Sequence, residues 1–89
     1  MVQRAVTIVN KLGLHARAAA KLVTTAASFT SEIDLSKNGQ RVNGKSIMGV
    51  MMLAASRGTE LIIYASGTDE VAALDSLEQL IADRFGENE

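Results

Sequence analysis

The Asn38-Gly39 dipeptide is the feature that most restricts how this chain can fold. Both residues accept the positive φ angles that a two-residue hairpin turn requires. Before it, residues 32–36 alternate between polar and apolar side chains, which predicts a half-buried strand, and residues 40–43 form the returning strand. The chain therefore contains an antiparallel pair of strands, and other elements must cover one face of that pair.

Hydrophobic periodicity predicts two more strands and a first helix. Residues 2–9 alternate, with Val2, Val6 and Ile8 on one side, and the apolar residues 61–65 predict a central strand. From Ala16 onward, apolar residues recur at helical spacing. The stripe expected to face the core of this helix consists of Ala16, Ala19, Ala20, Val23 and Ala27.

Two further helices are expected, over residues 46–55 and after Glu70. Ser46 is a suitable N-cap for the first, and Asp69 and Glu70 place negative charge at the positive end of the second. The residues of the first that we expect to face inward are Ile47, Val50, Met51 and Ala54. The stripe of the second consists of Val71, Leu74, Leu77 or Glu78, Ile81 and Phe85.

The element order βαββαβα predicts an α+β open-faced sandwich, in which three helices cover one face of a four-stranded, mostly antiparallel sheet. The 89 residues suffice for a single domain, residues 1–89. Aromatic residues make up 3% of the chain, which argues for tight packing and against an aromatic-lined ligand cavity. The related sheet that stacks RNA bases on aromatic side chains is disfavoured, because the central strands offer only Tyr64.

Composition excludes several kinds of chemistry. The absence of cysteine and the single histidine exclude disulfides, zinc–thiolate and iron–sulfur sites, thiol catalysis and a multi-histidine metal site, so we expect no metal and no cofactor. The net charge of −1 gives no drive toward nucleic acid, and no apolar run approaches the roughly 18 residues of a membrane span. No signal peptide is recognisable, so a cytoplasmic protein, expected to be a monomer, is the default.

Charge is unevenly distributed along the chain. Residues 1–58 carry eight basic and two acidic residues, a net charge of +6, whereas residues 59–89 carry one basic and eight acidic residues, a net charge of −7. One interpretation is an ordinary solvated surface with the acids on a C-terminal helix. The other is a basic face that steers the domain toward an acidic partner.

The candidate chemistry is concentrated in the segment Gly13-Leu14-His15-Ala16-Arg17. We expect His15 at the entry to the first helix, where the N–H groups of Ala16, Arg17 and Ala18 would lack intrahelical acceptors. These amides, the helix dipole and the Arg17 guanidinium form a site for an anion. They also disfavour a cationic ring, so His15 should be neutral and able to accept a phosphoryl group. No carboxylate lies near His15 in the sequence to activate water, so carriage of that group is favoured over hydrolysis.

A structural interpretation of the same residues stays open. A lone histidine near a helix start is more often a cap or a surface residue. Gly13 is also suited to a simple turn, and Arg17 to a solvated charge. The spacing alone does not distinguish these interpretations.

Two separated motifs resemble the HPr family, the histidine phosphocarriers of the bacterial phosphotransferase system. The first is Gly13-Leu14-His15-Ala16-Arg17 followed by Ala19-Ala20, and the second is Asn43-Gly44-Lys45-Ser46-Ile47-Met48-Gly49-Val50-Met51. The resemblance spans nearly the whole chain, including its length, the Asn10-Lys11 lead-in and the element order. It implies the HPr-like open-faced sandwich.

The resemblance also implies roles for individual residues. His15 would take a phosphoryl group on Nδ1 from enzyme I, which is charged by phosphoenolpyruvate, and pass it to sugar-specific IIA proteins, with Arg17 beside the phosphate. The chain would then be a phosphorylated intermediate in a relay and not an enzyme. It departs from the family at Ala18, where the family usually has proline, and we expect a small loss of stability with intact chemistry.

Ser46 and the residues after it form a second candidate site. Ser46 is an expected N-cap, and the resemblance implies that it is also the serine phosphorylated by HPr kinase/phosphorylase in many bacteria. Met48 and Met52 are expected to be exposed, and together with Ile47 and Met51 they would make an adaptable docking surface for partners.

An alternative function is a regulatory binding module of the same family, from its nitrogen-related or catabolite-repression branch. Such a module would act through protein–protein contacts at Ser46 and the Met48 surface, with His15 secondary. A regulatory relative that has lost phosphocarriage should lack the histidine. His15 is present, which favours the phosphocarrier.

Overall fold

A computed structural model describes residues 1–89 and has the element order predicted from the sequence. A short 3-10 turn, η1 (Arg84–Gly86), follows the last helix. The regular elements are β1 (Val2–Thr7), α1 (Ala16–Ala27), β2 (Glu32–Lys37), β3 (Gln40–Asn43), α2 (Ile47–Met52), β4 (Glu60–Ser66) and α3 (Glu70–Ala82).

The four strands form one sheet in the order β1-β4-β2-β3, and every neighbouring pair is antiparallel. Asn38 and Gly39 turn β2 into β3 with φ angles of 50° and 84°, which confirms the predicted hairpin. β4 lies between β1 and β2, so the apolar segment at residues 61–65 is central, as predicted. Leu61 and Ile63 on this strand are fully buried.

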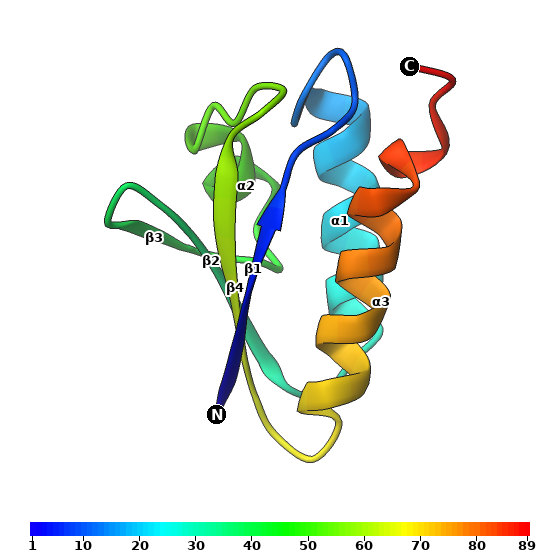
Figure 1. The fold of residues 1–89 in the computed structure, drawn as a ribbon. Coiled ribbons are helices and arrows are strands. Elements are labelled where there is room, and N and C mark those ends of the chain that lie inside the picture. Colours follow the sequence, from blue (N-terminus) through cyan, green and yellow to red (C-terminus); the bar gives the residue numbers. More distant parts are fainter.

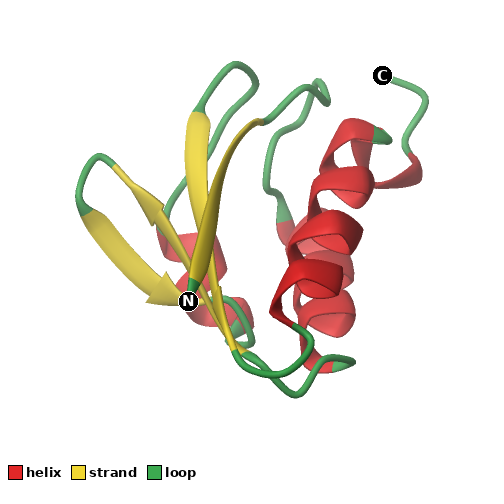
Figure 2. Cartoon of the chain, turned by 60° about the horizontal axis from the view of Figure 1, so that its bottom comes forward, coloured by secondary structure: helices red, strands yellow, loops and turns green.

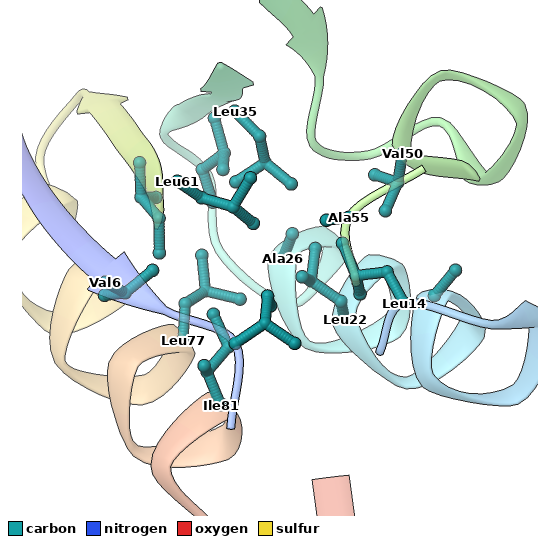
Figure 3. Packing of buried hydrophobic residues seen from close by; sticks show 14 of the residues in the cluster. Val6, Leu14, Leu22, Ala26, Leu35, Val50, Ala55, Leu61, Leu77 and Ile81 are labelled. Atoms are coloured by element: carbon teal, nitrogen blue, oxygen red, sulfur yellow. The ribbon is translucent and has the colours of Figure 1, made fainter. Parts of the chain in front are cut away.

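The helices and the sheet form two layers with the core between them. α1 and α3 pack against each other on one face of the sheet, and α2 packs against α1 and β3 (Figures 1 and 2). Figure 3 shows the strand side chains pointing toward those of the two long helices. Among the labelled core residues, Val6, Leu35 and Leu61 come from the strands. Leu22, Leu77 and Ile81 come from α1 and α3. No helix has the length and apolar character needed to cross a bilayer.

The buried stripe of α1 differs from the predicted one. The fully buried residues of this helix are Ala18, Ala19, Leu22 and Ala26. Ala16 and Ala27, which we expected to face the core, are exposed. The prediction is wrong because alanine occurs on several faces of the helix and so does not identify the face that packs on the core. The larger Leu22 does lie on the buried face.

α2 is shorter than predicted and turns a different face to solvent. Val50 is its only buried residue, whereas Ile47 and Met51, expected in the core, are each 40% exposed. Ala54 takes a left-handed φ of 49° and is exposed, so the prediction that it faces inward is also wrong. This turn ends the helix and lets Leu53 and Ala55 enter the core instead.

On α3 the predicted stripe is correct except at its start. Leu74, Leu77, Ile81 and Phe85 are buried, but Val71 is exposed and Ala73 is buried in its place. Val71 lies to the side of the helix face that Ala73, Leu77 and Ile81 define at a spacing of four residues, so it points away from the core.

Asp69 joins the start of α3 to the connection between α1 and β2. Its carboxylate accepts hydrogen bonds from the backbone N–H groups of Thr30 and Ser31, each at 2.9 Å, and from the Ser31 hydroxyl. The Ser31 hydroxyl and the Thr30 amide lower the pKa of Asp69 from 3.8 to about 2. Folding therefore favours the ionised carboxylate at this position.

We predict that Asp69 makes the stability of the fold depend on pH in the acid range. Because its folded pKa is depressed, the stabilisation is complete above the ordinary pKa of 3.8 and is lost as the pH falls toward about 2. Asp69→Asn should therefore melt below the wild type at neutral pH, and the difference in Tm should shrink across this acid window. Asp83→Asn, at an acid that makes no side-chain hydrogen bond, is the control. A difference for Asp69→Asn that is constant with pH would contradict the prediction.

Candidate functional site

The loop between β1 and α1 is fixed to the segment that precedes β4. Backbone hydrogen bonds join Ile8 N–H to Thr59 O at 2.9 Å, Gly58 N–H to Ile8 O at 2.7 Å, and Leu14 N–H to Ala55 O at 2.8 Å. Leu14 is buried. His15, the next residue, therefore precedes α1 at a point that these hydrogen bonds hold in place.

The structure places His15 at the N-cap of α1. Its φ and ψ angles are −73° and 177°, its carbonyl accepts from Ala19 N–H at 2.8 Å, and its side chain does not cap the helix. The N–H groups of Ala16, Arg17 and Ala18 have no backbone acceptor. Those of the exposed residues Ala16 and Arg17 remain available as donors, whereas Ala18 is fully buried. The Ala18 N–H, which we expected to be a third donor, therefore does not face solvent. The imidazole is 28% exposed beside them.

Arg17 is a free cation at the same place. Other basic residues pair with acids of the C-terminal part, as Arg4 does with Asp75 at 2.7 Å and Glu78 at 3.0 Å. The guanidinium of Arg17 makes no ion pair and no hydrogen bond within the chain. The opposite charges of the two parts of the sequence thus partly neutralise each other, and Arg17 stays available for an anion.

No acid is close to His15 in the sequence, but the fold brings Glu87 into contact with the ring. Glu87 Oε2 meets His15 Nε2, and Glu87 Oε1 accepts from Asn10 Nδ2 at 2.9 Å. The Asn10 hydrogen bond, and then the His15 hydrogen bond, lower the pKa of the Glu87 carboxyl. His15 Nδ1, by contrast, has no hydrogen-bond partner in the chain.

Three consecutive left-handed residues return the end of the chain to His15. Arg84, Phe85 and Gly86 have φ angles of 56°, 55° and 78°. Such a conformation costs roughly 1–2 kcal/mol for each non-glycine residue, and it is offset here by complete burial of the Phe85 side chain. Residues 84–89, the C-terminal segment, then lie at the same end of the molecule as the β1–α1 loop (Figure 1).

Two further contacts hold the C-terminal segment. Lys21 Nζ donates to Phe85 O at 2.6 Å, and the backbone N–H of Lys11 donates to Glu89 O at 2.8 Å. The C-terminal segment and the β1–α1 loop line an open depression of about 770 Å³ around the His15 ring. Its lining is formed by Lys11, Leu12, His15, Ala16, Arg17, Glu87, Asn88 and Glu89.

The residues of the second candidate site lie on α2, which packs against α1. The Ser46 hydroxyl accepts from Gly49 N–H at 3.1 Å, which confirms the predicted N-cap. Met48 and Met52 are 69% and 66% exposed, as expected. With the half-exposed Ile47 and Met51 they form one apolar surface, the α2 patch.

The family description "PTS HPr component phosphorylation site" matches residues 2–83. The chain belongs to the HPr family. It is 56% identical over 89 residues to the phosphocarrier protein HPr of Cupriavidus necator, with both chains covered completely. The chain is thus an HPr phosphocarrier protein of the phosphotransferase system by family, and the matched region contains both His15 and Ser46.

Solved structures agree with this assignment. The crystal structure of HPr-C-His from Thermoanaerobacter tengcongensis superimposes with a TM-score of 0.96 at 45% identity, with 100% of each chain covered. A second structure, of an HPr dimer from the same organism, gives a TM-score of 0.79 at 46% identity and covers 98% of this chain and 100% of that one. The predicted HPr-like sandwich is thereby confirmed, whereas a monomer in solution stays a prediction.

The sequence reasoning missed Glu87 and Asn10. Glu87 is 72 residues from His15 along the chain, so no local spacing connects them. The one available signal is the pair Phe85-Gly86, an apolar residue in phase with α3 followed by a residue that permits a reversal. That pair predicts that the chain reverses direction after α3. It does not predict that the reversed segment reaches His15.

Gly13 is the position where this HPr-family loop tolerates least change. Its φ is +67°, and an added Cβ would lie 2.5 Å from Ala55 O and 2.9 Å from Ser56 Cα. Gly13→Ala should therefore combine left-handed strain of roughly 1–2 kcal/mol with a packing cost of about 1–3 kcal/mol. Gly39→Ala is the matched control, because Gly39 has a φ of +84° with nothing within 4 Å. Chemical denaturation should show the larger loss for Gly13→Ala, and equal losses would contradict the clash.

Proposed function

We propose that this chain carries a phosphoryl group on His15 Nδ1, taken from enzyme I and given to IIA components of the sugar phosphotransferase system. The observation that carries the proposal is the arrangement around the only histidine. Nδ1 is unpartnered, the exposed N–H groups of Ala16 and Arg17 are free at the same helix start, and Arg17 has no ion pair. Family membership supports the same assignment.

The transfer uses the lone pair of Nδ1. This pair attacks phosphorus, and a bond between phosphorus and Nδ1 forms as the bond between phosphorus and the donor breaks, its electrons leaving with the donor. The ring becomes positively charged if Nε2 keeps its proton, and the phosphoryl oxygens stay negative. The N–H groups of the exposed Ala16 and Arg17, with the Arg17 guanidinium, are suited to hold those oxygens.

Carriage of the group is favoured over its hydrolysis. Glu87 is the carboxylate in contact with the ring, and its two oxygens are engaged by Asn10 and by His15 Nε2. Glu87 contacts Nε2, on the opposite side of the ring from Nδ1, so it is not placed to take a proton from a water that attacks phosphorus on Nδ1. The phosphoryl group would therefore persist until a protein acceptor removes it.

The α2 patch is suited to bind both enzyme I and IIA proteins. Met48 and Met52 expose flexible side chains that can adapt to different partner surfaces. Leu12, which lines the depression at His15, is also 67% exposed and offers a partner an apolar contact at the site itself. Ser46 precedes the patch, so phosphorylation there by HPr kinase/phosphorylase would place about −1.5 to −2 charges beside it.

We predict that His15 is the only phosphoryl acceptor in the relay. Label from phosphoenolpyruvate, transferred through enzyme I, should give an acid-labile, base-stable phosphate that is absent in His15→Ala. Arg17→Ala should keep the fold and slow transfer at least about tenfold, because it removes charge stabilisation without core volume. Arg57→Ala, at another exposed arginine, should transfer at the wild-type rate. Label retained in His15→Ala would refute the acceptor role.

A charge at Ser46 should weaken transfer without unfolding the protein. Aspartate is itself a good N-cap, so Ser46→Asp should keep Tm within a few degrees of the wild type. The same charge lies beside the α2 patch, and burying it against a partner is unfavourable, so phosphorylation by enzyme I should slow at least about tenfold. Met48→Asp places the charge inside the patch without touching the cap and should show the same defect. Wild-type transfer by Ser46→Asp would leave Ser46 as a cap alone.

A further inference from the structure

The contact between Glu87 and His15 permits one arrangement of protons. An ionised carboxylate only accepts hydrogen bonds, and the depressed pKa of Glu87 keeps it ionised at neutral pH. Nε2 of His15, which faces Oε2, must therefore carry a hydrogen. In a neutral imidazole the lone pair is then on Nδ1, the nitrogen that has no partner in the chain.

Asn10 fixes which way the carboxylate of Glu87 points. Asn10 is fully buried, and its Nδ2 donates to Gly13 O at 2.9 Å and to Glu87 Oε1 at 2.9 Å. Turning the amide over would place its oxygen against two acceptors, so its orientation is determined by its neighbours. Asn10 Oδ1 is buried without a partner, which shows that Asn10 is held in place by what its Nδ2 binds.

We propose that Glu87, oriented by Asn10, is a positioning residue for phosphoryl transfer at His15. It holds the ring with the hydrogen on Nε2, so that Nδ1 presents its lone pair to phosphorus. When the new bond forms, Nε2 keeps its hydrogen and the ring gains a positive charge, which the Glu87 carboxylate stabilises. This inference rests on the proposed function, because it deepens the role of the same histidine.

The charges on the two sides of the ring would then be complementary. The phosphoryl oxygens are negative and lie toward the free N–H groups and Arg17, whereas the positive ring lies against Glu87. A histidine held by a carboxylate through the opposite nitrogen is also the arrangement by which serine proteases select a tautomer and stabilise an imidazolium. Here the histidine is itself the nucleophile.

Glu87→Gln should reverse the tautomer. Asn10 Nδ2 is a donor and cannot turn, so the amide oxygen of the substituted side chain must face it. The amide NH₂ is then left to donate to Nε2 of His15, which moves the ring hydrogen to Nδ1. The nitrogen that should attack phosphorus would lose its lone pair.

The first measurement reports which nitrogen of the His15 ring carries hydrogen. It does not require phosphoryl transfer. ¹⁵N NMR of the histidine ring at about pH 8, where histidine is ordinarily neutral, distinguishes a protonated from an unprotonated nitrogen. We expect hydrogen on Nε2 in the wild type and predominantly on Nδ1 in Glu87→Gln. Glu60→Gln is the matched control, because Glu60 is an exposed glutamate at the start of β4 that lies outside the depression and does not touch the ring.

Phosphorylation by enzyme I completes the test. Glu87→Gln should slow transfer at least about tenfold while the protein stays folded with a Tm only a few degrees lower, and Glu60→Gln should slow transfer by less than about twofold. An unchanged tautomer in Glu87→Gln, or hydrogen on Nδ1 in the wild type, would overturn the positioning role while leaving His15 as acceptor. Label retained in His15→Ala would instead overturn the proposed function, whatever the ring spectrum shows.

Discussion

The attachment of the β1–α1 loop to the backbone before β4 is the constraint on which the site depends. Leu14 N–H binds Ala55 O, and Gly13 approaches that carbonyl so closely that no side chain could be accommodated. Because Leu14 is buried, the next residue must emerge at the helix start with its ring at the surface. The free amides of α1 and the imidazole thus have fixed relative positions before any partner binds.

The parts of the fold that follow from short-range patterns could be predicted from the sequence. Asn38-Gly39 specifies its hairpin because few residues accept two positive φ angles, and Ser46 caps α2 because its hydroxyl reaches an amide three residues away. The rotation of α1 could not be predicted, because alanine fits a buried or an exposed position equally well. The exposure of Ile47 and Met51 depends on the left-handed turn at Ala54, and the sequence shows no glycine there to signal it.

The candidate site was predictable on one side only. The side proposed to bind the phosphoryl oxygens, with His15, Arg17 and the helix amides, is contiguous in sequence and follows from helix geometry. The other side is assembled by tertiary structure. Glu87 reaches the ring only because Phe85 is anchored in the core and three left-handed residues reverse the chain, and Asn10 meets it from the far end of the sequence.

The ends of the chain lie at opposite ends of the molecule, with Met1 beside Glu70 and the C-terminal segment beside His15 (Figure 1). This arrangement has a practical consequence for anyone who attaches the protein to a surface, a fluorophore or a purification handle. A group joined at Met1 projects from the far end of the sheet and leaves the imidazole open. A group joined after Glu89 starts in the wall of the depression and competes with partner proteins for the same space.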